Sequence, residues 1–303
     1  MDPALFPDFY FVGAPKAATT SIFHYLGQHP DLFLPEIKEP HYFSCPEVKE
    51  TYYQVTFIDD TEQYLALYNE GTNRLRGDCS TSYLFSIEAA RRIRNCRPDA
   101  KIFMILRNPI DRAISHYLMD MRFGLIDIPL INILNDPSRY PLYFKEYVEG
   151  SLYADQVNRY LAAFPSDQIN IILYEEISAD PSSVLKGIFK SMGVSQNVSL
   201  SFNRANEHRV YRNQALRRIT KSTFLRSLAR RIPPPMKEWT QAMLTTRRKP
   251  PLDLERDRLS ELLQDDMNRL ALTINRDLSR WSHGTIKESV TSRHHVFSEP
   301  QSL

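Results

Sequence analysis

Short apolar runs that favour β-strands alternate with helix-patterned segments up to about residue 195. The apolar runs lie at residues 9–12, 102–106 and 169–174, and residues 74–79 form a further candidate strand. Apolar residues recur at helical spacing between these runs, at residues 19–26, 87–97, 110–118, 153–164 and 182–192. Strands that are apolar throughout are typical of a parallel sheet that helices cover on both faces. The alternation therefore predicts an α/β fold built on a central parallel sheet flanked by helices.

The pattern changes after this region. Residues 209–237 contain nine Lys or Arg and no Asp or Glu, and they show no strand pattern. An amphipathic helix is expected at residues 254–278, closing on Trp281, and the polar residues 283–303 are typical of a disordered tail. We therefore expect one domain over residues 1–282, with a helical C-terminal part.

Composition excludes several classes of protein. The 303 residues are 42% hydrophobic and 24% charged, which is typical of a globular protein and not of a disordered chain, a collagen or a coiled coil. The net charge of +2 gives no reason to expect a nucleic acid or a membrane as partner. Three cysteines without CxxC spacing argue against a disulfide framework or a zinc site. The N-terminus carries Asp2 and Asp8 where a signal peptide carries positive charge, and no apolar run reaches the ~18 residues needed to span a bilayer. We therefore expect a cytoplasmic protein without a membrane anchor.

The loop at residues 13–21, between the first strand and the first helix, has the features of an anion site. Backbone N–H groups and the helix dipole face such a loop, Lys16 adds positive charge, and the residues that follow carry hydroxyls. It is not a Walker A loop, because the lysine precedes the small residues and the glycine pattern is absent; the whole chain has nine glycines. The alternative is an ordinary turn with a surface lysine and a Thr cap.

Two other segments carry candidate polar groups. Arg107 follows the strand at residues 102–106, and Ser115 lies on the next helix, where both could meet one anion. The alternative is that Arg107 pairs with Asp111 and Ser115 fills space. Glu39 and His41 lie in a charged, aromatic segment, and either could act as a general base; the alternative is a surface turn with aromatics in the core.

In chain order, these motifs resemble those of the sulfotransferases that use 3′-phosphoadenosine 5′-phosphosulfate (PAPS). The resemblance is to the branch that contains the heparan sulfate sulfotransferases and their bacterial relatives, and it covers roughly residues 8–282. The motifs are PKAATTS, KEPHYF, RGDCSTSYL, ILRNPIDRAISHY, GSLYADQVNRYLAAF, the basic stretch around Asn206–Arg212, and RDLSRW.

The resemblance implies a three-layer P-loop-like fold, PAPS as cosubstrate, 3′,5′-diphosphoadenosine (PAP) as product, and no metal. It implies that Lys16 neutralises charge on the leaving phosphate oxygens. The other residues of the 5′-phosphosulfate loop would be Ala17, Ala18, Thr19, Thr20 and Ser21.

The resemblance also implies roles for residues outside that loop. Arg107 and Ser115 match the pair that binds the 3′-phosphate, and Glu39 matches the carboxylate base, with His41 as the next candidate. Arg209 and Arg212 match a loop over the cofactor phosphates.

Two departures from the family pattern affect these expectations. Residues 78–81 read Asp-Cys-Ser-Thr where relatives have an acidic residue followed by lysine, so a second active-site lysine is missing and a polysaccharide acceptor is disfavoured. The phosphate loop has Ala17 and Ala18 where relatives often have glycine, which requires that both alanines keep negative φ.

The predicted function is sulfuryl transfer from PAPS to a hydroxyl or to an amine or amide nitrogen of a small polar metabolite or natural product. A P-loop-type nucleotide kinase and a non-catalytic nucleotide-binding module are the alternatives, and an RNA-binding protein would rely on residues 209–237.

Overall fold

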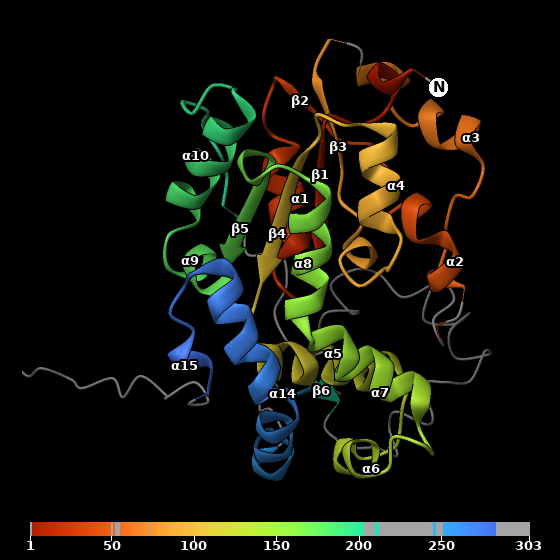
Figure 1. Cartoon of the computed structure of the whole chain (residues 1–303), viewed down its shortest axis with the longest axis vertical. Coiled ribbons are helices and arrows are strands. Elements are labelled where there is room, and N and C mark those ends of the chain that lie inside the picture. The colour runs from red at the N-terminus through yellow and green to blue at the C-terminus, as the bar shows by residue number, and fades with distance from the viewer. Residues whose placement is uncertain are drawn as a thin grey trace, which may run out of the picture.

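The centre of the protein is a five-stranded parallel sheet in the order β2-β3-β1-β4-β5 (Figure 1). The computed structural model describes residues 2–49, 51, 55–71, 73–202 and 251–282, and the backbone of 210–211 and 245–246. The strands of the sheet are β1 (Phe9–Gly13), β2 (Leu32–Phe33), β3 (Leu75–Asp78), β4 (Lys101–Leu106) and β5 (Ile169–Leu173). The predicted parallel α/β architecture is confirmed.

The two central strands are apolar because the sheet is covered on both faces. Every residue of β1 is buried, and Phe11 stacks on Phe103 of β4 with ring centroids 4.7 Å apart. The pairing of β1 with β4 shifts after Phe11, so that Gly13 pairs with Met104. A Cβ on Gly13 would lie 2.6 Å from the Cβ of Leu84, so only glycine allows this close approach at the end of β1.

Helices form a layer on each side of the sheet (Figure 1). On one face α4 (Ala89–Cys96) packs against α8 (Tyr153–Ala163). On the other, α1 (Thr19–Leu26) lies beside α10 (Pro181–Met192), and the His29 ring after α1 packs on Phe189 of α10 with centroids 4.5 Å apart. The predicted three-layer arrangement is therefore confirmed.

Helices α5 (Pro109–Phe123), α6 (Leu130–Asn135), α7 (Pro141–Tyr147) and α14 (Asp253–Ile274) extend the molecule beyond the C-terminal ends of the strands (Figure 1). The last long helix packs against α5, α6 and α8 through buried Leu259, Leu263 and Leu270, which confirms the helical C-terminal part. The other helices are α2 (Cys45–Val48), α3 (Thr61–Ala66), α9 (Tyr174–Ala179) and α15 (Ser279–Ser282). Short 3₁₀ turns lie at residues 3–5, 42–44, 69–71, 81–83, 149–151 and 166–168.

Some sequence expectations differ from the structure. Residues 209–237 were expected to hold no strand, yet β6 (Val210–Tyr211) pairs antiparallel with β7 (Thr245–Thr246), so that expectation is wrong at its start. Tyr174, expected to end a strand, begins α9. The expected tail at residues 283–303 lies outside the described residues.

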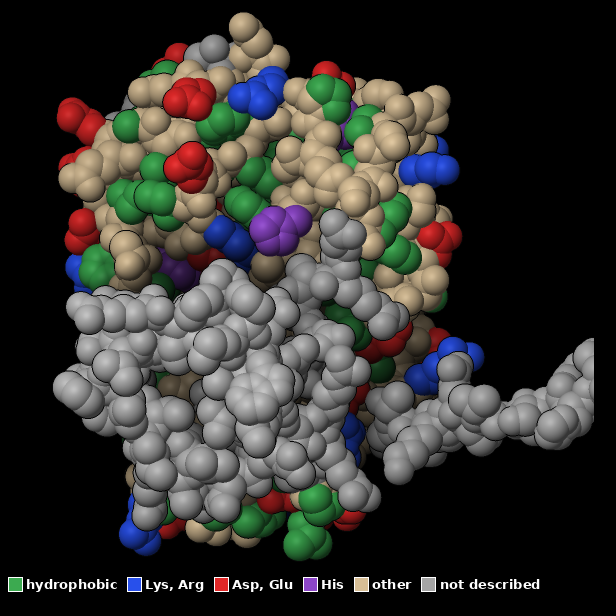
Figure 2. Space-filling view, turned by 180° about the vertical axis from the view of Figure 1, so that it is seen from behind, with side chains coloured by type: hydrophobic (Ala, Val, Ile, Leu, Met, Phe, Trp, Pro, Cys, Tyr) green, Lys and Arg blue, Asp and Glu red, His purple; other side chains and the backbone are tan. Residues whose placement is uncertain are grey.

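The described surface shows no dominant charge on the face that Figure 2 presents. Acidic, basic and hydrophobic side chains are interspersed there over the part of the chain that the structure describes (Figure 2). Within the same part of the chain, no helix combines the length and the hydropathy needed to cross a membrane.

Candidate active site

The loop from β1 to α1 leads into a helix whose N-cap residue is an alanine. Ala18 makes no side-chain cap, and among the described residues no side chain bonds the first amides of α1. The loop is tied to β4, because the Ala14 amide donates to the Ile105 carbonyl at 2.7 Å. Uncapped amides and the helix dipole together favour an anion at this position. The alternative of a Thr-capped turn is therefore not what the loop adopts.

The two alanines of the loop differ in conformation. Ala18 has φ 61°, in the left-handed region, whereas Ala17 is buried without such a conformation. The requirement that both alanines keep negative φ is thus not met at Ala18. Thr19, Thr20 and Ser21 form the first residues of α1, with Thr19 buried and the other two half-buried.

The side chain of Lys16 is half-buried and lies along α5. Its Nζ donates to the Met119 sulfur at 3.0 Å, which is a weak acceptor and the one hydrogen-bond partner of this ammonium group among the described residues. Burial lowers the pKa of Lys16 to about 8; Asp120 opposes that shift, and Arg107 adds to it. A cation with so little compensation favours a bound anion.

Arg107 lies at the end of β4, beside this loop. Its Nη1 donates to the Lys16 carbonyl at 3.0 Å, and its guanidinium lies over the ring of Tyr174, 4.6 Å from the centroid. Asp111, the alternative partner from the sequence, accepts instead from Arg256 of α14. Arg107 is therefore held at the carboxyl end of the sheet, where open α/β folds bind ligands.

Ser115 carries a buried hydroxyl on α5. It is 6% exposed, and no group among the described residues bonds to its Oγ. Ser115 is four residues before Met119 on α5, so both lie on the helix face along which Lys16 runs. An orphaned buried hydroxyl is costly unless a ligand satisfies it, which fits a site for an anion.

Glu39 lies near the end of β1, where the loop to α1 begins. Its carboxylate pairs with Lys38 and accepts a hydrogen bond from Thr81 Oγ1 at 3.0 Å. The Thr81 carbonyl is 3.2 Å from where a Cβ of Gly13 would be, so this carboxylate is fixed next to the end of β1. The side chain of Glu39 is 25% exposed, which leaves it accessible from solvent.

His41 completes this side of the site. Its Nε2 is 3.8 Å from Glu39 Oε2, and its Nδ1 is 2.7 Å from Ser82 Oγ. Burial lowers the pKa of His41 and Lys38 adds to that shift, whereas the Glu39 carboxylate opposes it. The imidazole is therefore neutral at neutral pH, as a general base must be.

The segment without the second lysine is organised around a buried carboxylate. Asp78 is fully buried and accepts hydrogen bonds from Ser80, Tyr64 and Tyr83 at 2.7–2.8 Å. Burial raises the pKa of Asp78 to about 6. Cys79, at the position of the missing lysine, is buried, and burial raises its pKa as well.

Several residues of this site were not predicted from the sequence. Met119, Thr81, Ser82 and Tyr174 contact predicted site residues, and only the four-residue spacing from Ser115 to Met119 is visible in the sequence. The other candidates, Arg209 and Arg212, lie outside the described residues. Among the residues that are described, no cluster of three or more His, Cys, Asp or Glu could hold a metal ion.

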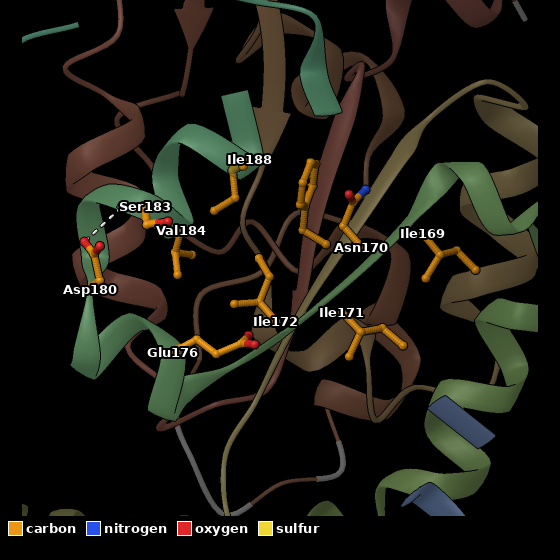
Figure 3. A pocket seen from close by; sticks show the side chains of 11 residues that line it. Ile169, Asn170, Ile171, Ile172, Glu176, Asp180, Ser183, Val184 and Ile188 are labelled. Atoms are coloured by element: carbon orange, nitrogen blue, oxygen red, sulfur yellow. Dashed lines mark hydrogen bonds between the residues drawn. The ribbon is translucent and has the colours of Figure 1, made fainter. Parts of the chain in front are cut away.

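A separate groove of about 670 Å³ lies between β5 and the α9–α10 segment (Figure 3). Ile172, Val184 and Ile188 gather in it, whereas Ile169 and Ile171 point to the other face of β5 (Figure 3). None of the residues that line it is a candidate site residue. The candidate site residues therefore lie away from this groove, which is a separate feature of the sheet edge.

Comparison with known proteins defines the family. The profile of the sulfotransferase domain matches residues 6–228, which is more than half of the chain. The chain therefore belongs to the sulfotransferase domain family, as the motifs indicated.

Individual relatives agree with this assignment. The chain is 27% identical over 206 residues to the bifunctional heparan sulfate N-deacetylase/N-sulfotransferase 4 of Mus musculus, covering 64% of this chain and 23% of that protein. It is 26% identical over 197 residues to the heparan sulfate glucosamine 3-O-sulfotransferase 6 of Homo sapiens, covering 64% of this chain and 54% of that protein. The chain thus spans less than two thirds of either relative.

A solved structure matches more completely. The sulfotransferase from Alicyclobacillus acidocaldarius is 29% identical, with a TM-score of 0.69, and the match covers 91% of this chain and 98% of that one. The sulfotransferase domain from the curacin biosynthetic pathway, at 13% identity and a TM-score of 0.50, shares the fold. These matches are to sulfotransferases, and they give no support to a nucleotide kinase.

Proposed function

We propose that this protein transfers the sulfuryl group of PAPS to a hydroxyl or to an amine or amide nitrogen of a small polar acceptor, a metabolite or natural product. PAPS is the cosubstrate and PAP the product. Residues 1–282 act as one domain in this proposal, and the family match at residues 6–228 supports it.

The observation that carries the proposal is the placement of three anion-binding groups around the β1–α1 loop and α5. Lys16 lies along α5, Arg107 is bonded to the Lys16 carbonyl, and the unpartnered Ser115 hydroxyl lies on the same face of α5. PAPS has phosphates at both the 3′ and the 5′ position. Lys16 and the start of α1 fit the 5′ group, and Arg107 with Ser115 fits the 3′ group.

The residues of the loop meet the electrostatic need of such a transfer. When PAPS is bound, it supplies an activated sulfuryl group on a phosphate leaving group, on which negative charge builds as in phosphoryl transfer. The Lys16 ammonium and the uncapped amides of α1 lie where they can stabilise that charge. Opposite them, Glu39 or His41 accepts the proton that the acceptor loses.

The choice of acceptor rests on two observations. The names of the relatives include both N- and O-sulfotransferases, so both kinds of acceptor atom are retained. Cys79 stands buried where related enzymes have a lysine, which disfavours a polyanionic polysaccharide. We therefore favour a small polar acceptor over a glycan chain.

The first experiment is incubation with labelled PAPS and a metabolite extract, followed by separation of labelled products. Lys16→Ala should remove most of kcat, because no other described side chain replaces its ammonium at the leaving group. Lys101→Ala is a matched control, since Lys101 lies at the opposite end of β4 and its Nζ bonds the Asp167 carbonyl at 3.1 Å. Equal activity of the two variants would contradict the role of Lys16.

The acceptor side is tested by Glu39→Gln, which should lower kcat while nucleotide affinity is kept. Unchanged turnover would transfer the role of the base to His41.

The donor site is tested by Arg107→Ala, which should weaken binding of PAPS far more than binding of adenosine 5′-phosphosulfate, which lacks the 3′-phosphate. Equal losses would contradict a 3′-phosphate contact.

A thermal-shift screen separates this function from the alternatives, since a ligand that binds only the native state raises Tm. PAP should stabilise the protein, whereas ATP with Mg²⁺ and RNA should not. Stabilisation by ATP alone would overturn the proposal in favour of a kinase.

A further inference from the structure

A short chain of hydroxyl groups runs behind the imidazole of His41. Ser82 Oγ is 2.7 Å from His41 Nδ1, and Ser44 Oγ is 2.6 Å from Ser82 Oγ. Ser44 Oγ is in turn 3.4 Å from the carbonyl of His41 itself. His41 and Ser44 follow Glu39 in the sequence and are both buried, whereas Ser82 lies in the short turn after β3.

The carbonyl at the end of this chain favours one direction for its hydrogen bonds. A carbonyl oxygen only accepts, so Ser44 Oγ is the donor in the 3.4 Å contact, and the same carbonyl also accepts from the Ser44 amide at 3.2 Å. The 2.6 Å contact allows either serine as donor, and when Ser44 donates to the carbonyl it accepts from Ser82, which in turn accepts from His41. In that arrangement the hydrogen of the neutral imidazole is on Nδ1, and Nε2 carries a lone pair.

The backbone of His41 is fixed independently of this chain. The His41 amide donates to Ser80 Oγ at 3.2 Å, and Ser80 donates to the buried Asp78 carboxylate at 2.7 Å. His41 has φ 56°, so its backbone conformation is one that needs such support. The ring is thereby held with Nε2 toward Glu39, and the charged groups that face it are Glu39 and Lys38.

We propose that Ser82, supported by Ser44, is a positioning residue that holds His41 in its Nδ1–H tautomer and presents the Nε2 lone pair on the acceptor side of the site. This inference rests on the proposed function, and it resolves which groups there can take a proton. In that tautomer Nε2 has no hydrogen to offer the Glu39 oxygen, which is 3.8 Å away.

The consequence for the reaction is a defined path for one proton. When the acceptor O–H or N–H bond breaks, its proton moves to Nε2, and its electron pair stays on the acceptor atom, which bonds to the sulfuryl group as PAP leaves. The imidazolium so formed keeps its Nδ1–H bond to Ser82. The Glu39 carboxylate beside it stabilises the new positive charge, as a carboxylate beside a catalytic histidine does. Glu39 and His41 thus act as a pair in which the imidazole accepts the proton.

The tautomer can be measured on the free protein by nuclear magnetic resonance of ¹⁵N-labelled histidine. The expected result is a His41 Nδ1 signal in the protonated range and an Nε2 signal in the unprotonated range, assigned by their loss in His41→Gln. The opposite pattern in the wild-type protein would overturn the proposal without any variant.

Variants of the two serines test the cause. Ser82→Ala should shift His41 toward the Nε2–H tautomer, and Ser82→Thr, which restores a hydroxyl, should return it. Ser44→Ala should have a similar but smaller effect, because it frees the Ser82 hydrogen to donate to Nδ1. Ser86→Ala is the matched control: Ser86 is a buried serine whose Oγ donates to Glu47 at 2.7 Å. An unchanged tautomer in both Ser82→Ala and Ser44→Ala would refute the inference.

Activity provides a second readout. We expect Ser82→Ala to lower kcat about tenfold or more while PAP affinity changes less than about twofold, since general base catalysis contributes roughly 10²–10⁴ in rate. If the predicted tautomer is found but no acceptor is ever sulfated, the proposed function fails and the tautomer stands. If sulfation is found and the tautomer is reversed, the inference fails and the proposed function stands.

Discussion

Binding of PAP is expected to draw a proton onto Lys16. Burial lowers the pKa of this lysine to about 8 in the free protein, with Arg107 contributing and Asp120 opposing. A phosphate at the start of α1 favours the charged ammonium form, so the pKa of Lys16 in the complex should return toward its ordinary value of 10.5. The difference between the free and bound values appears as proton uptake.

The size of this uptake follows from the two pKa values. With a pKa of about 8, the neutral fraction of Lys16 in the free protein is about 0.1 at pH 7, 0.5 at pH 8 and 0.9 at pH 9. These fractions are the protons taken up per PAP, because the nucleotide phosphates, with a second pKa of about 6, add little above neutral pH. PAP affinity should therefore fall about tenfold, or ~1.4 kcal/mol, from pH 7 to pH 9.

Isothermal titration calorimetry in buffers of different ionisation enthalpy measures this directly. The slope of the observed enthalpy against the buffer ionisation enthalpy is the number of protons taken up. Lys16→Arg keeps a positive charge at every pH in this range and should show no uptake, and Lys16→Met should show none with weaker binding. A slope near zero at pH 8 for the wild-type protein, or the same slope in Lys16→Arg, would refute the reasoning.

Three further variants test other features of the structure. Ser115→Ala should leave the free protein as stable or more stable, because it removes a buried hydroxyl that no described group bonds, while PAP affinity falls roughly tenfold. Adenosine 5′-phosphate, titrated in parallel, should bind both proteins equally well. An equal loss of affinity for adenosine 5′-phosphate would count against a 3′-phosphate contact of Ser115. Ala18→Gly should remove the steric strain of a Cβ at φ 61° and stabilise the protein by about 1 kcal/mol, or roughly 2 °C in Tm. Differential scanning calorimetry measures this change, and a lower Tm in the variant would contradict the prediction. Asp78 has a folded pKa of about 6, above its unfolded value of 3.8, so its contribution to the free energy of unfolding should fall by about 3 kcal/mol as pH rises through that range. Urea unfolding of wild type and Asp78→Asn from pH 4 to pH 7 should show this change in their difference, and a constant difference would argue against it.

The sequence predicted the parts of the molecule that follow from local pattern. Runs such as residues 102–106 are apolar throughout because β4 is covered on both faces, so they identify the central strands. Lys16 and Arg107 each follow such a strand, and the carboxyl ends of neighbouring parallel strands meet at one edge. That they meet could therefore be expected from their positions alone.

Other features depend on contacts that no local pattern records. The strand β2 has only two residues, and its place beside β3 is set by pairing rather than by periodicity. Alanine has no intrinsic preference for left-handed φ, so the conformation of Ala18 is imposed by the loop around it. The hydroxyl chain from His41 to Ser44 joins residues up to 41 positions apart in the sequence and becomes visible only in the fold.

The start of α5 is held by a residue far along the chain. The side chain of Asn108 accepts from the first amides of α5, and its Nδ2 donates to the Trp281 carbonyl at 3.1 Å. On the ribosome, all five strands of the sheet emerge before residues 253–282 are made. A nascent chain can therefore assemble its sheet early, but the Arg107–Asn108 corner gains this last support only when Trp281 has left the exit tunnel. The candidate anion site should therefore mature late in synthesis, well after the sheet on which it is built.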